Sequence, residues 1–297
     1  MKRNHVLTRW WHSRAVRQTR RLASPRLWYR YLTAGRRGLP NFIIAGAQKG
    51  GTTSLFGYLE GHPQCLPAST KEVHYFDKNF DRGESWYRMH FPPRSRISPN
   101  ANPPRLSFES SPYYMCEPRV PARMQELLPN VKLIFLLRNP VNRAYSHYQH
   151  SVLRRREPLS FEDALEAEHD RLGGEEAKML ADPAYPSFSH QHFSYLLRGI
   201  YADQLARWHK HFAPEQMLVL EAERMFNKPA EVFAEVVEFL ELTAWQPASF
   251  ENLNSGRYKG PMKPHTRAKL EAYFAPHNRR LHDILGWRTS WELKRAA

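Results

Sequence analysis

The chain has 297 residues, of which 41% are hydrophobic and 13% aromatic, which is enough to bury a core and excludes a wholly disordered protein. Its formal net charge is +15, and eleven Lys and Arg residues lie between Lys2 and Arg37, before the first acidic residue, so an anionic partner is expected. Two cysteines, Cys65 and Cys116, are too few for a disulfide framework and stand in no metal-binding pattern, which favours idle thiols and no metal site.

Residues 1–38 are predicted to form a basic N-terminal arm. The segment contains Trp10, Trp11, Trp28 and Tyr29 but no acidic residue, and it lacks the apolar middle of a secretory signal. No run of about 18 apolar residues occurs anywhere in the chain, so no transmembrane helix is expected. A solvated arm is the favoured interpretation, and contact with an anionic membrane or a transit peptide remains an alternative.

A strand, a glycine-rich loop and a helix are predicted next. Residues 41–45 form a short apolar run, and Leu55, Phe56 and Leu59 recur at helical spacing. The loop between them reads Gly46-Ala47-Gln48-Lys49-Gly50-Gly51-Thr52-Thr53-Ser54. Its glycines let backbone N–H groups converge on an anion, and the helix that follows adds the positive end of its dipole.

This loop does not match a Walker A loop. Lys49 precedes two glycines, whereas the Walker lysine directly precedes a Ser or Thr that holds magnesium. We find no acidic magnesium partner at the end of a strand. The loop is therefore predicted to bind an anion without a metal, and a P-loop kinase using ATP and magnesium is kept as an alternative.

Titratable side chains gather among aromatic residues in the segment that runs from Lys71 to Asp77. A transfer to a hydroxyl needs a base, and a partly desolvated Glu72 with a raised pKa would suit that task. His74 is a second possibility, because imidazole titrates near neutrality. Residues 77–105 have little periodicity and are predicted to be irregular, before a short strand over 106–109.

A second strand–loop–helix unit follows. Residues 131–137 are the clearest strand of the chain, and Pro140 suits the first turn of a helix. Arg138 stands at the end of the strand, and Ser146 lies two turns into the helix. A guanidinium and a hydroxyl in this arrangement suit a phosphate. Arg143 is expected to be structural or peripheral.

The rest of the chain completes an α/β pattern. Residues 155–192 are predicted to be a surface insert, 217–220 a third buried strand, 232–240 a helix, 252–264 a polar loop and 266–285 the last helix. Alternating strands and helices indicate a parallel sheet with helices on both faces, and such sheets bind ligands at the C-terminal ends of their strands. We expect one domain over 39–290, with a tail at 291–297.

The motifs together resemble those of sulfotransferases that use 3′-phosphoadenosine 5′-phosphosulfate (PAPS), most closely the heparan-sulfate type. The resemblance rests on three segments: the pattern Gly-x-Gln-Lys-x-Gly-Thr-Thr-Ser, the pattern Arg-x-Pro-x-x-Arg-Ala-x-Ser and the segment from Lys71 to Asp77. The resemblance covers roughly residues 40–290. It implies the sulfotransferase fold, with its P-loop-like parallel sheet, and in-line transfer of a sulfuryl group from PAPS to a hydroxyl or amine.

The resemblance also implies roles for single residues. Lys49 and Glu72 would be catalytic, Lys49 at the leaving phosphate and Glu72 as base. Gly50, Gly51, Thr52, Thr53 and Ser54 would hold the 5′-phosphate, Arg138 and Ser146 the 3′-phosphate, and Tyr258, Lys259 and Gly260 would close over the nucleotide. Lys71, His74, Asp77, Ser111 and Tyr113 would lie on the acceptor side.

A carbohydrate, a glycolipid or a small alcohol would fit as acceptor, and nucleic acid is not expected. The resemblance favours a bacterial-type soluble member in the cytoplasm, with peripheral contact with a membrane as an option. A non-catalytic polyanion- or membrane-binding protein remains a rival interpretation. It accounts for residues 1–38 and leaves the two anion loops unexplained.

Overall fold

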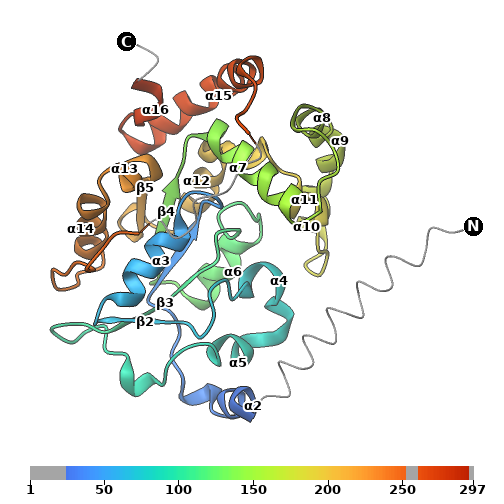
Figure 1. The fold of residues 1–297 in the computed structure, drawn as a ribbon. Helices are drawn as coiled ribbons and strands as arrows, with labels where there is room; N and C mark the ends of the chain where they lie inside the picture. The colour runs from blue at the N-terminus through green and yellow to red at the C-terminus, as the bar shows by residue number, and fades with distance from the viewer. Residues whose placement is uncertain (1–24, 252–259, 294–297) are drawn as a thin grey trace, which may run out of the picture.

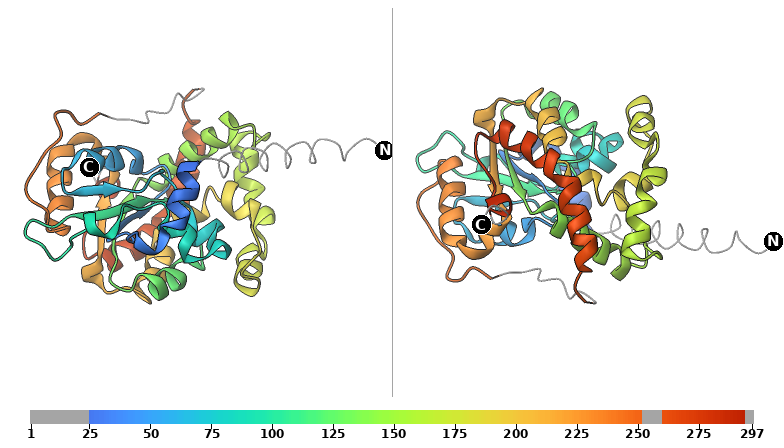
Figure 2. Two further views of the ribbon diagram at one scale, coloured as in Figure 1. Left: turned by 90° about the horizontal axis from the view of Figure 1, so that it is seen from below. Right: turned by 90° about the horizontal axis from the view of Figure 1, so that it is seen from above.

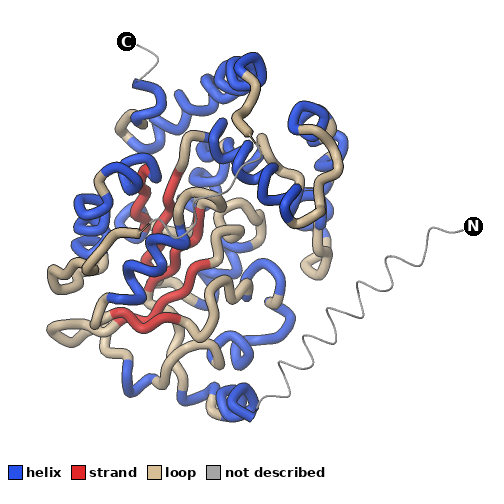
Figure 3. The backbone as a smooth tube through the Cα atoms, in the orientation of Figure 1, coloured by secondary structure: helices blue, strands red, loops and turns tan. Residues whose placement is uncertain are grey.

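The computed structural model describes residues 25–251 and 260–293, and it is built on a five-stranded sheet (Figures 1 and 3). Every neighbouring pair of strands is parallel, and the order across the sheet is β2-β3-β1-β4-β5. The strands are β1 (Phe42–Gly46), β2 (Cys65–Pro67), β3 (Leu106–Ser110), β4 (Lys132–Leu137) and β5 (Met217–Glu221). The predicted α/β class with a parallel sheet is confirmed.

The two faces of the sheet are covered by different helices. Phe42 and Ile44 of β1 pack in a core with α3 (Thr52–Gly61), α13 (Ala222–Asn227) and α14 (Pro229–Phe239). Ile43 and Ala45 point the other way, toward α6 (Val120–Leu127) and α12 (Tyr201–His209). Successive side chains of a strand alternate between faces, so a strand buried on both sides reads as a continuous apolar run.

A third core joins the predicted insert to the domain. It contains Val141 and Ala144 of α7 (Pro140–Leu153), Phe161 of the insert and Phe274 of α15 (Pro264–Leu285). The insert folds into α8 (Phe161–Glu166), α9 (Glu168–Leu172), α10 (Glu175–Ala181) and α11 (Phe188–His192), which lie on the side of the molecule away from α14 (Figure 2). The predicted surface insert therefore has a buried inner side.

The part of the predicted arm that the structure describes is packed on the domain. Residues 25–38 contain α2 (Pro25–Leu32) and the 3₁₀ turn η1 (Ala34–Arg36). Arg30 donates from Nε to the carbonyl of Met89 at 2.6 Å, and Arg37 donates from Nη1 to the carbonyl of Phe91 at 2.9 Å. Residues 1–24, which complete the arm, lie outside the described residues.

The remaining elements are short. The predicted irregular segment contains α4 (Tyr75–Lys78), η2 (Phe80–Arg82), α5 (Gly83–Arg88) and η3 (Arg94–Arg96), while η4 (Leu197–Gly199) and η5 (Pro214–Gln216) flank α12. The predicted tail begins with α16 (Ser290–Leu293), whose Trp291 belongs to the same core cluster as residues of α6 and α12. Both cysteines are buried free thiols. Within the two described ranges, no helix is both long and apolar enough to cross a membrane.

Candidate active site

Three of the predicted site residues, Lys49, Glu72 and Arg138, follow strands that end on the same side of the sheet, because the strands are parallel. Lys49 follows β1 and Arg138 follows β4, its neighbour in the sheet. The segment that carries Glu72 follows β2 and is attached to the end of β3, since the Glu72 N–H donates to the carbonyl of Ser110 at 2.9 Å. Four strand ends thus face one site, as the topology of open α/β sheets requires.

The first loop is tightly wound at the start of α3. Gly51, which precedes the helix, has φ 94°, and Lys49 also has a positive φ of 71°. A Cβ atom on Gly50 would lie 2.3 Å from the carbonyl oxygen of Leu136 in β4, so only glycine allows the loop to pack on the strand. Thr52 and Ser54 are buried in the first turn of the helix. This loop and helix N-terminus have the features of an anion-binding site.

The second loop is bonded directly to the first. Arg138 donates from Nη1 to the carbonyl of Lys49 at 3.1 Å, and its own carbonyl accepts the hydroxyl of Tyr201 at 2.8 Å. Asn139 caps α7, its side-chain oxygen accepting the N–H groups of Val141 and Asn142. The two cationic side chains predicted to hold phosphates are therefore brought into adjacent loops.

Other residues predicted to bind the nucleotide are placed less favourably or lie outside the description. Ser146 on α7 is buried, and Arg143 is fully buried with its Nη2 donating to the carbonyl of Tyr195, which agrees with a structural role for Arg143. Gly260 is exposed, and its carbonyl accepts the hydroxyl of Tyr145 at 2.9 Å. Tyr258 and Lys259 lie outside the described residues.

Glu72, His74 and Asp77 form a chain of contacts. His74 Nδ1 lies 2.7 Å from Oδ2 of the buried Asp77, and His74 Nε2 lies 3.4 Å from Oε2 of Glu72. Lys71 Nζ donates to the other oxygen of Glu72 at 3.0 Å. Burial alone would lower the pKa of His74, but the Asp77 and Glu72 carboxylates outweigh it and raise that pKa to about 9. His74 is therefore a cation at neutral pH.

The expectation of a raised pKa for Glu72 is wrong in this structure. Contact with His74 lowers the pKa of Glu72 most, Lys71 lowers it further, and partial burial opposes them without reversing the direction. The Glu72 side chain is 46% exposed. The cost of burying its charge is therefore smaller than the stabilisation that the charge gains from two adjacent cations. Glu72 is thus a carboxylate at neutral pH, and its contacts with His74 and Lys71 make it a weaker base than an isolated carboxylate.

Ser111 and Tyr113, predicted to line the acceptor side, are buried instead. Ser111 accepts the backbone N–H of His74 at 3.1 Å and donates to the buried Glu109 at 2.7 Å. The Tyr113 hydroxyl lies 2.7 Å from Nδ1 of His190, which belongs to the insert. Ser111 thus supports the segment that carries Glu72, whereas the Tyr113 hydroxyl contacts the insert.

Sequence reasoning missed His150. This residue lies on α7 and is partly buried; burial lowers its pKa most, the charge of Lys49 lowers it further, and the charge of Glu72 raises it. Burial and the nearby cations hold the pKa of His150 at about 4, which leaves its ring neutral at neutral pH. Its spacing of four residues from Ser146 puts both on one helix face, which was the available signal.

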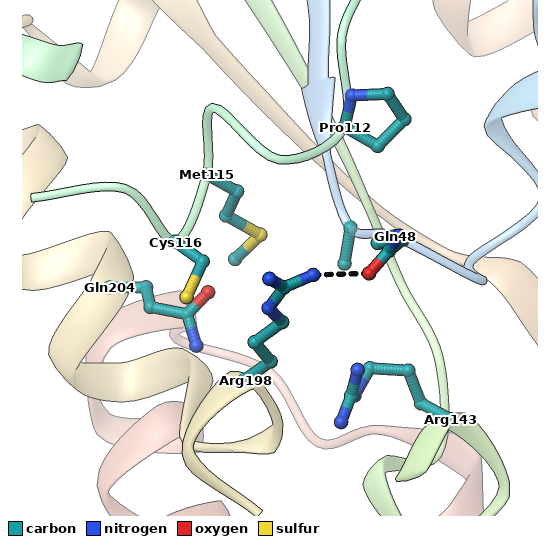
Figure 4. Close-up of a pocket in the computed structure, with 8 residues that line it drawn as sticks. Gln48, Pro112, Met115, Cys116, Arg143, Arg198 and Gln204 are labelled. Carbon is teal, nitrogen blue, oxygen red and sulfur yellow. Dashed lines mark hydrogen bonds between the residues drawn. The ribbon is translucent and has the colours of Figure 1, made fainter. Parts of the chain in front are cut away.

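A small cavity lies behind the first loop (Figure 4). Arg198 extends across it and donates from Nη1 to the side-chain oxygen of Gln48. Ala47, Pro112, Met115, Cys116, Arg143 and Gln204 complete the lining. In the described parts of the chain, no group of three His, Cys, Asp or Glu side chains is arranged to hold a metal ion.

Comparison with known proteins relates the chain to sulfotransferases. A family profile described as "Sulfotransferase domain" matches residues 39–273. Membrane-associated sulfotransferase kil1 of Dictyostelium discoideum is 28% identical over 86% of this chain and 67% of its own length. Heparan sulfate glucosamine 3-O-sulfotransferase 6 of Mus musculus is 30% identical over 87% of this chain and 75% of its own length.

A solved structure agrees with the fold. A sulfotransferase from Alicyclobacillus acidocaldarius is similar with a TM-score of 0.65 and 29% identity, covering 85% of this chain and 98% of the other.

Proposed function

The chain belongs to the sulfotransferase domain family, and from that premise we propose that it transfers the sulfuryl group of PAPS to a hydroxyl or amine of a carbohydrate acceptor. Family membership makes the chain a sulfotransferase and removes the reasons for the kinase and the non-catalytic binder.

The observation that carries the proposal is the bond between the two anion loops. Arg138 reaches the carbonyl of Lys49, so one cationic side chain follows β4 and another follows β1 at the same sheet edge. A nucleotide with separate 3′- and 5′-phosphates needs two such loops at a fixed spacing. We assign the 5′-phosphate to residues 50–54 and the 3′-phosphate to Arg138, with Ser146 as its neutral donor.

The chemistry follows from the charges at the acceptor side. Glu72 takes the proton of the acceptor hydroxyl, whose oxygen then forms the new bond to sulfur. As that bond forms, the bond from sulfur to the bridging phosphate oxygen breaks, and Lys49 stabilises the negative charge left on that oxygen. The 3.4 Å contact from His74 to Glu72 is long, so an entering acceptor can replace it and let the pKa of Glu72 rise.

A carbohydrate acceptor is supported by the relatives, one of which is named for heparan sulfate glucosamine. The cations around Glu72 fit an anionic sugar. Lys71 contacts Glu72, and Lys78 Nζ lies 3.4 Å from His74 Nε2. These side chains give the mouth of the site a positive rim that attracts negatively charged groups on the acceptor.

The test is calorimetric titration with 3′-phosphoadenosine 5′-phosphate (PAP), the product of the donor, beside ATP with magnesium. We expect tight binding of PAP alone, weakened roughly tenfold or more in Lys49→Ala and in Arg138→Ala, since each variant loses a charged contact. A preference for ATP with magnesium, or PAP binding unchanged in both variants, would overturn the assignment of the donor site.

We further propose that the protein contacts an anionic membrane through its N-terminal end. On α2, Trp28, Tyr29 and Leu32 are 57%, 65% and 78% exposed, although Arg30 fixes the helix to the domain. An apolar and aromatic surface next to a segment with eleven cations and no acid fits a lipid headgroup layer. The relative named as membrane-associated supports the same interpretation.

A further inference from the structure

Arg198 is a buried cation that contacts the loop of residues 46–54 through Gln48. The side chain is 3% exposed and comes from the turn η4, just beyond the insert. Nη1 donates to the Gln48 side-chain oxygen (Figure 4). The guanidinium lies 4.6 Å from the centre of the Tyr113 ring. Gln48 directly precedes Lys49, so Arg198 contacts the loop next to the proposed catalytic lysine.

The other end of the guanidinium is held by the insert. Nη2 donates to the carbonyl of His190 at 2.9 Å and to that of Gln191 at 2.6 Å, both in α11. The turn before Arg198 is fixed as well, because Glu168 of α9 accepts the N–H of Leu196 at 2.7 Å and that of Leu197 at 2.9 Å. Among the ion pairs of residues 25–251 and 260–293, none joins Arg198 to a carboxylate.

We propose that Arg198 is a positioning residue that sets the orientation of the Gln48 amide for the sulfuryl group. A guanidinium has only donors, so it can accept no hydrogen from Gln48 and must bind the amide oxygen. With the oxygen engaged, the amide NH₂ of Gln48 is turned away from Arg198 and presents two donors beside Lys49. Donors at that place match the oxygens of a sulfuryl group, and this inference rests on the proposed donor site.

The chain of bonds gives the insert a part in the reaction. Carbonyls of α11 and a carboxylate of α9 fix Arg198, Arg198 fixes Gln48, and Gln48 is in the loop that holds the donor. A displacement of the insert is therefore transmitted to the position of the amide donors. The positioning is specific to the sulfuryl end, because the 5′-phosphate is assigned to residues 50–54 on the other side of Lys49.

PAPS and PAP differ only in the sulfuryl group, so their affinities measured side by side isolate this end of the donor. In Arg198→Met we expect the Kd for PAPS to rise roughly tenfold, the loss of one charge-assisted contact, while the Kd for PAP changes by less than about twofold. Gln48→Glu keeps an oxygen for Arg198 and removes the NH₂. It should show the same loss for PAPS with no fall in Tm.

Arg143→Met is the matched control. Arg143 lines the same cavity and donates to the carbonyl of Tyr195, but it has no bond to Gln48. This variant should lose thermal stability without changing the ratio of the PAPS and PAP affinities.

Two results would overturn the inference. One is an equal loss of PAPS and PAP affinity in Arg198→Met, which would make Arg198 a general support of the fold. The other is unchanged PAPS affinity in Gln48→Glu, a variant that tests the amide even if Arg198→Met does not fold. Absence of PAP binding to the unmodified protein is a separate result that would count against the donor site itself.

Discussion

At the scale of single residues, the notable feature is a histidine held between two carboxylates. His74 contacts Asp77 at 2.7 Å and Glu72 at 3.4 Å, so the buried carboxylate is the stronger partner. Asp77 thereby stabilises the histidine cation, and the cation in turn keeps Glu72 ionised. Asp77, five residues further along the chain, therefore affects the proton affinity of the proposed base Glu72 through His74.

Removing the charge of Asp77 should release the histidine. In Asp77→Asn we expect the pKa of His74 to fall from about 9 toward the ordinary value near 6.5, as measured by NMR of its ring protons. A raised pKa means that the cation persists until the pH passes the folded value. In the variant the His74 ring becomes neutral within this range and no longer lowers the pKa of Glu72, so the variant should gain activity relative to the unmodified protein as the pH rises from about 6 to 9. A ratio of activities that stays constant over this range would contradict the argument.

Sequence patterns predicted the local groups of the site better than its long-range bonds. Lys49, Glu72 and Arg138 belong to motifs whose spacing is visible in the chain, and the structure places them at one sheet edge. The bond from Arg198 to Gln48 joins residues 150 positions apart, so no local pattern announces it. The sequence also does not predict the lowered pKa of Glu72, because the exposure of the side chain and its charged neighbours decide the direction of the pKa shift.

At the scale of elements, the strand–loop–helix units were predicted where apolar runs end in glycine or proline. Residues 131–137 and 217–220 match β4 and β5 closely. β2 was missed because Cys65–Pro67 has only three residues and one of them is proline, which patterns alone do not read as a strand. Its place beside β3 is fixed by tertiary pairing.

The start of α7 offers a test at this scale. Asn139 accepts two backbone N–H groups of the helix and follows Arg138 directly. We expect Asn139→Ala to lower the free energy of unfolding by about 1 kcal/mol and to weaken PAP binding several-fold, because a frayed helix start releases Arg138. Chemical denaturation and calorimetry measure the two effects. Asn139→Asp, which keeps the cap, should retain most of the stability, and a loss as large as that of Ala would refute the capping argument.

At the scale of the whole molecule, charge and apolar surface are concentrated at the N-terminal end. The eleven cations before Gly38 account for most of the net charge, and α2 carries large exposed aromatic side chains. A protein with this asymmetry has a preferred orientation next to a negatively charged surface. The bonds from Arg30 to the carbonyls of Met89 and Phe91 make α2 a fixed part of the domain.

Vesicle sedimentation tests the proposed membrane contact. We expect the full chain to bind vesicles of phosphatidylserine and phosphatidylcholine, and to be released as salt screens the headgroups. Replacing Trp28 and Tyr29 by serine keeps the charge and should weaken binding at a given salt concentration. Equal binding to purely zwitterionic vesicles, or no effect of the two replacements, would argue against this surface as the contact.

The order of the strands also separates the residues that we propose for the two substrates. Reading from β2 to β5, the sheet presents first the proposed base, then Ser111, then Lys49, then Arg138. The half of the sheet that we propose for the acceptor therefore ends at β1, where the half that we propose for the donor begins. We therefore expect that a chimera carrying the segment from β2 to β3 of a relative would change its acceptor preference and keep its donor site. The two specificities could then be engineered separately.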